Sequence, residues 1–175
     1  MTINQENLKG LTGLLIFEIG KQEYCIDIQI VSDIILRKDV KIKINTFNQA
    51  TINIGDLEYK VIPLHSLLGY PELNRNNGCR AILIDVFGKR IAFLVDEVVE
   101  IITTDKIFVE KSLDLKLLYN KKYLNGLIKF QEREFFIPNL EIISKELEKL
   151  AKISTANKAF RGTLYNNEMF RRGDH

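Results

Sequence analysis

The sequence predicts an all-β fold built from two small closed or nearly closed barrels. Short apolar runs recur along the chain, many of them alternate apolar and polar residues with a period of two, and turn residues separate them. The runs are too short and too numerous for one open sheet, whereas two small barrels fit a chain of 175 residues. One long helix near the end of the apolar pattern completes the predicted fold.

The first predicted element is a β-hairpin. Its strands read "LLIFEI" over 14–19 and "EYCIDI" over 23–28, and Gly20 and Lys21 lie in the turn between them. The alternation in the second strand places successive side chains on opposite faces. The sequence therefore predicts two paired antiparallel strands at the start of the fold.

A short helix is expected directly after this hairpin, over 28–35. Asp27 can cap its start, and Ile28, Val31 and Ile35 recur at helical spacing. The sequence then predicts nine further strands, at 40–44, 50–54, 59–64, 80–87, 90–96, 98–103, 106–110, 123–130 and 134–138.

The long helix is predicted over 139–152, where Asn139 can cap the first turn. Glu141 and Glu148 each precede a lysine by four residues, at Lys145 and Lys152, which favours a helix. The apolar stripe of this helix consists of Leu140, Ile143, Leu147, Leu150 and Ala151.

The two ends of the chain are expected to be flexible and to flank one domain over 14–152. Residues 1–13 precede the first strand, and the polar segment 153–175 loses the helical periodicity. The aromatic residues of that last segment are alternative docking points for a partner. They are Phe160, Tyr165 and Phe170.

The composition predicts a globular protein that attracts neither nucleic acid nor membranes over a distance. The chain has 25 Lys and Arg against 23 Asp and Glu, and a net charge of +2 gives no long-range field for a polyanion. No apolar run approaches the ~18 residues of a membrane span, and the first residues lack the pattern of a signal peptide. We therefore expect a cytoplasmic protein without direct membrane insertion.

The cysteines and histidines predict neither a metal site nor a cofactor. Cys25 and Cys79 form no CxxC pair, and His65 and His175 are the only histidines. We expect two reduced, half-buried thiols.

The adjacent carboxylates Asp96 and Glu97, in "GKRIAFLVDEVVEI" (88–101), are the most enzyme-like feature of the sequence. Neighbouring residues on a strand point to opposite faces, so these two cannot form a cooperating catalytic pair. We expect Asp96 to end the strand by accepting hydrogen bonds from nearby backbone amides, and Glu97 to face water.

Two other candidate catalytic groups lack partners. His65 is beside Ser66 only by adjacency in the sequence, with no GxSxG motif, and is expected to be a core or surface histidine. Asp56 and Glu58 share one strand face but have no nearby nucleophile. The sequence therefore predicts no enzyme. A nucleic-acid-binding barrel, suggested by "KKYLNGLIKF" (121–130), is the weaker alternative because the charges balance.

Three segments resemble the CheW family, the adaptor domain of bacterial chemotaxis. The first has a Gly turn, Glu-Tyr and Asp-Ile, the second has Val-Asp-x-Val, and the third is a closing hairpin that leads into the last helix. They read "FEIGKQEYCIDIQIVSDI" (17–34), "GKRIAFLVDEVVEI" (88–101) and "YLNGLIKFQEREFFIPNLEII" (123–143). Their order and spacing match the family across about residues 14–150.

This resemblance implies two intertwined five-stranded SH3-like barrels in a cytoplasmic protein without catalytic activity. Members of the family bridge the cytoplasmic tip of chemoreceptors to the regulatory domain of the histidine kinase CheA, which is itself CheW-like. The barrels of such proteins pair end to end into rings. The resemblance thus implies the CheA regulatory domain and a chemoreceptor tip as partners, with ring-forming contacts between CheW-like domains as a further possibility.

One segment departs from the family pattern. The family usually carries Asn-Leu-Arg-Gly four residues ahead of Val-Ile-Pro, but "DLEY" (56–59) precedes "VIP" (61–63) here, so Glu58 replaces the arginine. This change reverses the charge and would repel a carboxylate partner suited to the arginine. Either the partner supplies a compensating basic residue, or this is a divergent scaffold that tethers another signalling complex.

The predicted binding residues follow from the resemblance. Val31 and Ile34 are expected in the receptor groove, whereas Val98 and Glu100 are weaker candidates, since packing in the core explains Val98 equally well. The full set of predicted protein-binding residues is Val31, Asp33, Ile34, Asp56, Leu57, Glu58, Val98 and Glu100.

Overall fold

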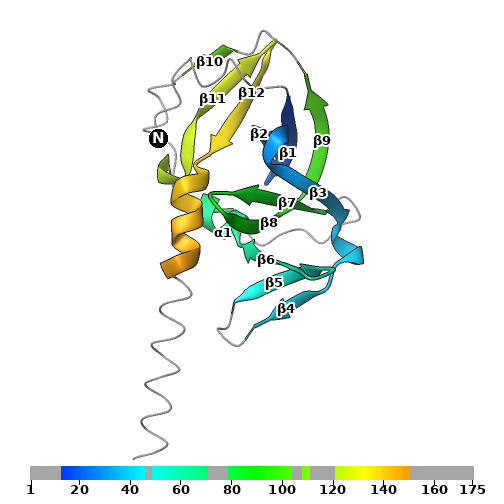
Figure 1. The fold of residues 1–175 in the computed structure, drawn as a ribbon. Coiled ribbons are helices and arrows are strands. Elements are labelled where there is room, and N and C mark those ends of the chain that lie inside the picture. Colours follow the sequence, from blue (N-terminus) through cyan, green and yellow to red (C-terminus); the bar gives the residue numbers. More distant parts are fainter. Residues whose placement is uncertain (1–12, 46–48, 71–78, 104–107, 111–120, 150–175) are drawn as a thin grey trace, which may run out of the picture.

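The computed structural model describes residues 13–45, 49–70, 79–103, 108–110 and 121–149, which form two six-stranded sheets (Figure 1). Sheet A contains β1 (Leu14–Ile19), β2 (Gln22–Asp27), β9 (Glu97–Ile102), β10 (Phe108–Glu110), β11 (Leu124–Phe130) and β12 (Arg133–Pro138). Sheet B contains β3 (Val31–Leu36), β4 (Ile42–Ile44), β5 (Ala50–Ile54), β6 (Leu57–Ile62), β7 (Arg80–Val86) and β8 (Lys89–Val95). The short helices are η2 (Ile28–Ile30), η3 (Arg37–Asp39), α1 (Leu64–Leu68) and η5 (Lys121–Tyr123).

The two sheets are intertwined in the order of the chain. Sheet A has the strand order β10-β11-β12-β2-β1-β9, and sheet B has the order β3-β7-β8-β6-β5-β4. The chain leaves sheet A after β2, builds all of sheet B, and returns to sheet A at β9. The predicted all-β fold with two groups of strands is therefore confirmed, with six strands in each sheet where the resemblance implied five.

The core has three parts, and strand β1 contributes to two of them. Leu14 and Ile16 are buried in a cluster within sheet A, whereas Leu15, Phe17 and Ile19 are buried in a larger cluster that both sheets line. We call this larger cluster the shared core. Because both faces of β1 are covered, the strand reads as a nearly continuous apolar run.

Strands β7 and β8 have the same role in sheet B. Ala81, Leu83 and Ala92 face a cluster within sheet B, while the alternate residues face the shared core. These alternate residues are Ile82, Ile84, Ile91, Phe93 and Val95. The two sheets are therefore joined by packed side chains along the full length of these strands.

The helix 140–149 begins as predicted and covers one side of the shared core. The Asn139 side chain accepts a hydrogen bond from the amide of Ile142 at 3.1 Å, and Ile143 is buried in the shared core. The expected pair of Glu141 and Lys145 forms at 2.7 Å. Residues 150–152 lie outside the described residues, as do the ends 1–12 and 153–175, so the flexibility of the ends stays a prediction.

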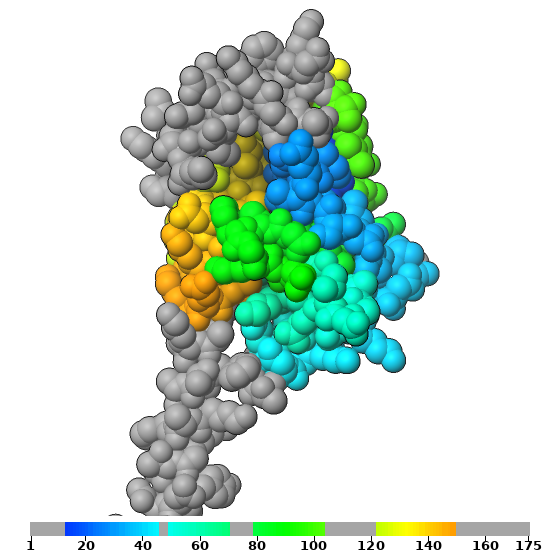
Figure 2. All heavy atoms as spheres, in the orientation of Figure 1, coloured from blue at the N-terminus to red at the C-terminus, as the bar shows by residue number. Residues whose placement is uncertain are grey.

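An ion pair connects the helix 140–149 to the β7–β8 hairpin. Lys89 donates to Glu148 at 2.5 Å. In Figure 2 the green atoms of this hairpin lie between the orange atoms of the helix and the blue atoms of the first strands. The helix is therefore tied to sheet B as well as packed on the shared core.

The predicted helix over 28–35 is wrong beyond its first turn. Asp27 caps η2 by accepting a hydrogen bond from the amide of Gln29 at 2.9 Å, but the chain becomes strand β3 at Val31. Strand β3 pairs with β7, with Val31 opposite Ile84. β-branched side chains suit this pleated surface, so pairing with a neighbouring strand outweighs the helical spacing.

The other predicted strands are found within two residues at each end. Helix α1 was not predicted, and it ends at Gly69, whose φ of 81° is the left-handed conformation that glycine adopts readily. The thiols differ from expectation, because Cys25 and Cys79 are fully buried rather than half-buried, with exposures of 1% and 2%. Burial raises the pKa of the Cys25 thiol to about 12.

Candidate protein-binding surfaces

The first group of predicted residues lies on β3, which is an edge strand of sheet B. Val31 and Ile34 are both half-buried against the shared core, although residues three apart on a regular strand point to opposite faces. A shift in register between Val31 and Asp33 accounts for this arrangement. Asp33 is exposed, and its carboxylate accepts a hydrogen bond from the amide of Ile34 at 2.7 Å.

The second group lies on β9, which is an edge strand of sheet A. Val98 is opposite Phe17 and is half-buried against the shared core, so it packs beside the same cluster as Val31 and Ile34. The sequence prediction missed two exposed apolar neighbours on this strand, Val99 at 41% and Ile101 at 53%. The available signal was the apolar run "VVEII", which is longer than the burial of one strand face requires.

We call Val31, Ile34, Val98, Val99 and Ile101 the junction surface; they are partly accessible apolar residues of the two edge strands β3 and β9. Ile101 is opposite Leu15, a buried residue of that core, and so it faces the same side of sheet A. The structure therefore brings the β3 and β9 candidates to one apolar core. It leaves part of their side chains accessible to a partner.

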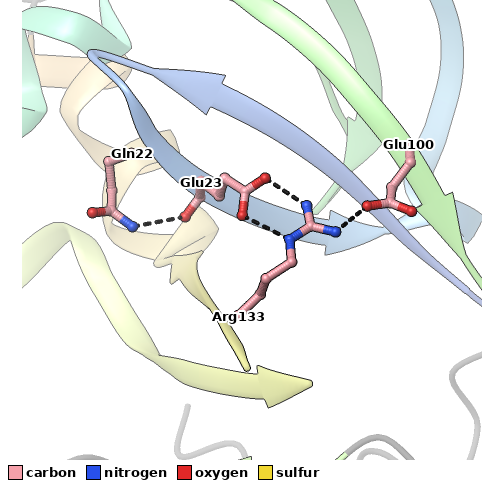
Figure 3. A network of polar contacts seen from close by, with 4 residues as sticks. All are labelled: Gln22, Glu23, Glu100 and Arg133. Atoms are coloured by element: carbon pink, nitrogen blue, oxygen red, sulfur yellow. Dashed lines mark hydrogen bonds and ion pairs between the residues drawn. The ribbon is translucent and has the colours of Figure 1, made fainter. Parts of the chain in front are cut away.

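Glu100 is exposed, but its carboxylate is already bound (Figure 3). Arg133 on β12 donates to Glu100 and also to both oxygens of Glu23 on β2, at 2.5 and 3.1 Å. The guanidinium lies over the ring of Phe135, 4.9 Å from its centre. These hydrogen bonds, first to Glu23 and then to Glu100, raise the pKa of Arg133 above its ordinary value. Glu100 thus helps to connect β2, β9 and β12.

The third group lies at the β5–β6 hairpin of sheet B, in a different place from the junction surface. Asp56 is in the turn, and Leu57 and Glu58 begin β6. All three are exposed, Leu57 by 41%. Glu58 is opposite Asn53, and neither Asp56 nor Glu58 has an ion-pair partner among the described residues.

Asp96 occupies a position between the sheets that its sequence neighbours did not suggest. Its carboxylate accepts hydrogen bonds from the amide of Gly20 at 2.7 Å and from Nε2 of His65 at 3.2 Å. The expectation that it bonds a backbone amide is confirmed, but the amide belongs to the distant β1–β2 turn. Glu97 is exposed, as expected, and His65 is a buried residue with an exposure of 7%.

Two tyrosines also connect the β1–β2 hairpin to the residues that follow α1. The hydroxyls of Tyr24 on β2 and Tyr70 after α1 lie 2.8 Å apart. Burial, together with this hydrogen bond, raises the pKa of Tyr24 well above its ordinary value of 10.0. Tyr70 also lies directly against Gly20, so the end of α1 presses on the β1–β2 turn.

The described residues include no group of three or more His, Cys, Asp or Glu side chains arranged to hold a metal ion. Within the same part of the chain, no helix has the length and apolar character needed to cross a membrane.

Comparisons with known proteins agree with this arrangement. No curated protein matches the sequence. Among solved structures, the fold is similar to the crystal structure of scaffolding protein TtCheW from Thermoanaerobacter tengcongensis, with a TM-score of 0.64 and 21% sequence identity. That match covers 75% of this chain and 86% of the other. The model of the CheW-like domain matches residues 13–148, which is most of the chain. The intertwined sheets, the Val-Asp-x-Val strand and this match together show that the chain belongs to the CheW-like domain family.

Proposed function

We propose that the chain is a non-enzymatic adaptor that couples chemoreceptors to the regulatory domain of the histidine kinase CheA in the cytoplasm. The membership of the CheW-like domain family over residues 13–148 is the observation that carries this proposal. The similar structure of TtCheW is that of a protein described as a scaffold, which fits the same role.

The receptor tip is proposed to bind the junction surface. This surface offers half-buried aliphatic side chains at Val31, Ile34 and Val98, and more exposed ones at Val99 and Ile101. Apolar residues of this kind can receive the apolar face of a helix, because burying them removes area from water without leaving polar groups unpaired. Asp33 at the edge of β3 provides a charged rim.

The kinase domain is proposed to bind near the β5–β6 hairpin, at Asp56, Leu57 and Glu58. An adaptor needs two surfaces that can be occupied together. The β5–β6 hairpin and the junction surface satisfy this requirement, because strands β6, β8 and β7 separate β5 from β3 in the order of sheet B.

A calorimetric titration against each partner tests the proposal. The natural chain is expected to bind a receptor cytoplasmic-tip fragment and the isolated CheA regulatory domain, each in the micromolar range, about −8 kcal/mol. Val31→Glu with Ile34→Glu should weaken binding to the receptor fragment and leave binding to the kinase domain unchanged.

Ile44→Glu is the matched control for these variants. Ile44 is 62% exposed and lies on β4, at the opposite edge of sheet B from β3. If the control weakens receptor binding as much as the paired variant does, the assignment of the junction surface is wrong. Circular dichroism and a thermal melt should accompany each variant, because Val31 and Ile34 also pack against the shared core.

The alternative is a divergent scaffold that tethers a different signalling complex. Glu58, in the place of the family's arginine, favours this alternative, since the reversed charge would repel the usual carboxylate partner. A folded natural chain that binds neither the receptor fragment nor the kinase domain would make this alternative the better account.

A further inference from the structure

The surface around Glu58 carries a pattern of charges that the sequence alone did not reveal. Lys43 on β4, Thr51 on β5 and Lys60 on β6 lie opposite one another in register. The next row on this face pairs Asn53 with Glu58. We call these five residues the lysine face.

The opposite side of the same strands confirms that the lysine face points outward. Ile52 and Tyr59 alternate with the residues of the lysine face and are buried in the cluster within sheet B, with exposures of 0% and 3%. Lys43, Lys60 and Glu58 are all exposed. Both ammonium groups and the carboxylate therefore project to one side of β4, β5 and β6.

These charges have no counterparts within the described part of the chain. Several other surface lysines are bound, such as Lys89 to Glu148 and Lys145 to Glu141, but neither Lys43 nor Lys60 forms an ion pair among the described residues. Thr51 lies between them in register on the same face and is only 1% exposed, so the flanking charges, and not the Thr51 hydroxyl, are accessible to a partner.

The strand spacing fixes the arrangement of the three charges. Lys43 and Lys60 lie on strands separated by one intervening strand, so their backbones are about 10 Å apart. Glu58 lies two residues before Lys60, which is about 7 Å along β6. The result is a flat triangle with two positive corners and one negative corner.

We propose that the lysine face binds a protein surface with two carboxylates about 10 Å apart and a basic side chain placed opposite Glu58. This inference rests on the proposed adaptor function, and it assigns that complementary surface to the kinase regulatory domain. A partner of this kind turns the reversed charge at Glu58 from a source of repulsion into one of three favourable contacts.

A protein fits this triangle better than nucleic acid or an anionic membrane does. Phosphates present negative charge everywhere, so Glu58, at one corner of the triangle, would oppose them. A folded protein surface can place carboxylates and a basic group at separate points. The net charge of +2 likewise provides little general attraction for a polyanion.

The test is a titration of the CheA regulatory domain with full-length variants at about 50 mM and about 500 mM salt. Lys43→Glu with Lys60→Glu should weaken binding at least about tenfold at the lower salt concentration and less at the higher one, because salt screens exposed charges. Glu58→Arg should also weaken binding, by about threefold or more, because it would face a basic group.

Lys145→Glu with Lys149→Glu is the matched control, since it changes the net charge equally on the exposed side of the helix 140–149. Its affinity should equal that of the natural chain within about twofold. Equal weakening by the control pair would overturn the lysine face as the site. Stronger binding by Glu58→Arg would overturn the basic group opposite Glu58.

The remaining outcomes separate this inference from the adaptor function. Kinase-domain binding that the lysine variants leave unchanged would overturn the lysine face but keep the adaptor. No binding of the natural chain to either the kinase domain or the receptor fragment would overturn both. Lysine-dependent binding to a DNA duplex or to phosphatidylserine vesicles, without lysine-dependent binding to the kinase domain, would identify a polyanion surface instead.

Discussion

The carboxylate of Asp96 accepts a hydrogen bond from the amide of Gly20 at 2.7 Å, although 76 residues separate them in the chain. Asp96 lies where the chain passes from β8 of sheet B to β9 of sheet A, and Gly20 is in the turn between β1 and β2. Nε2 of His65, in α1, donates to the same carboxylate at 3.2 Å. One side chain thereby connects three segments of the two sheets.

Replacing Asp96 should loosen this connection. Asp96→Ala leaves the amide of Gly20 without its acceptor and is expected to cost about 1–3 kcal/mol of unfolding free energy. Asp96→Asn keeps one acceptor oxygen and should cost less. Urea unfolding followed by circular dichroism measures both. The exposed neighbour provides the control, because Glu97→Ala should change stability by less than about 0.5 kcal/mol. Similar losses for Asp96→Ala and Glu97→Ala would refute the connection.

Gly20→Ala should destabilise the protein more than Gly88→Ala. Both glycines have a positive φ, +59° and +69°, so each alanine has a backbone cost of about 1 kcal/mol. A Cβ at position 20 would also lie 2.2 Å from Cδ1 of Tyr70, whereas nothing lies within 4 Å of one at position 88. In a Tyr70→Ala background, the cost of Gly20→Ala should fall to that of Gly88→Ala. Thermal or urea unfolding of the four variants completes this cycle, and an unchanged cost in the Tyr70→Ala background would contradict it.

Arg133→Gln should destabilise sheet A by about 1 kcal/mol at low salt. The variant leaves the carboxylates of Glu23 and Glu100 without their shared cation, and their repulsion is then screened as salt is added. The difference from the natural chain should therefore shrink between low and high salt in urea unfolding. Arg90→Gln is the control, because Arg90 is 3.9 Å from Asp85 and 49% exposed, and it should have little effect. A difference that does not respond to salt would point to lost packing on Phe135 instead.

The buried Cys25 thiol should make stability fall at alkaline pH. Its pKa of about 12 in the folded chain lies above the ordinary value of 9.0, so folding favours the neutral thiol. The stabilisation is complete below pH 9.0 and is lost as the pH rises towards about 12, by at most about 1.4 kcal/mol for each pH unit. We expect the natural chain to lose unfolding free energy relative to Cys25→Ala between pH 8 and pH 10, so the difference between the two should shrink as the pH rises.

Alkylation provides an independent measurement of the same thiol. Iodoacetamide at pH 8 should modify Cys25 in the unfolded chain and leave it intact in the folded one, because the side chain is 1% exposed and the thiolate is disfavoured. Mass spectrometry of the digested protein locates the modification. Rapid modification of Cys25 under native conditions would contradict the described burial.

The segment after β2 shows why a local pattern could not settle every element. Ile28, Val31 and Ile35 have helical spacing, and Asp27 does cap a turn, yet only Ile28–Ile30 is helical. The rest pairs with β7, which lies some fifty residues later in the sequence. Helical spacing is a local signal, whereas the partner strand is not, so the non-local pairing decided the outcome. Strands with clear alternation, such as β5, were predicted correctly because there the local pattern and the non-local pairing agree.

The candidate surfaces were predictable in part. The resemblance placed Val31, Ile34 and Val98 among the binding residues, and the structure puts them beside one core. The resemblance could not show that Glu100 is bound to Arg133, because that contact joins strands from distant parts of the chain. Nor could it show that Lys43 and Lys60 lie opposite Thr51, because register between strands depends on the whole sheet.

The insertion of sheet B within sheet A has a consequence for synthesis on the ribosome. The β1–β2 hairpin emerges before sheet B, but its edge partner β9 follows only after the whole of sheet B has been translated. At about 5–20 residues per second, the 76 residues between Gly20 and Asp96 take about 4–15 s to appear. During that interval the edge of β1 that β9 covers in the folded protein has no strand to pair with, so its backbone groups stay open to pairing with another chain. Sheet B, by contrast, can assemble as soon as its own strands have left the tunnel.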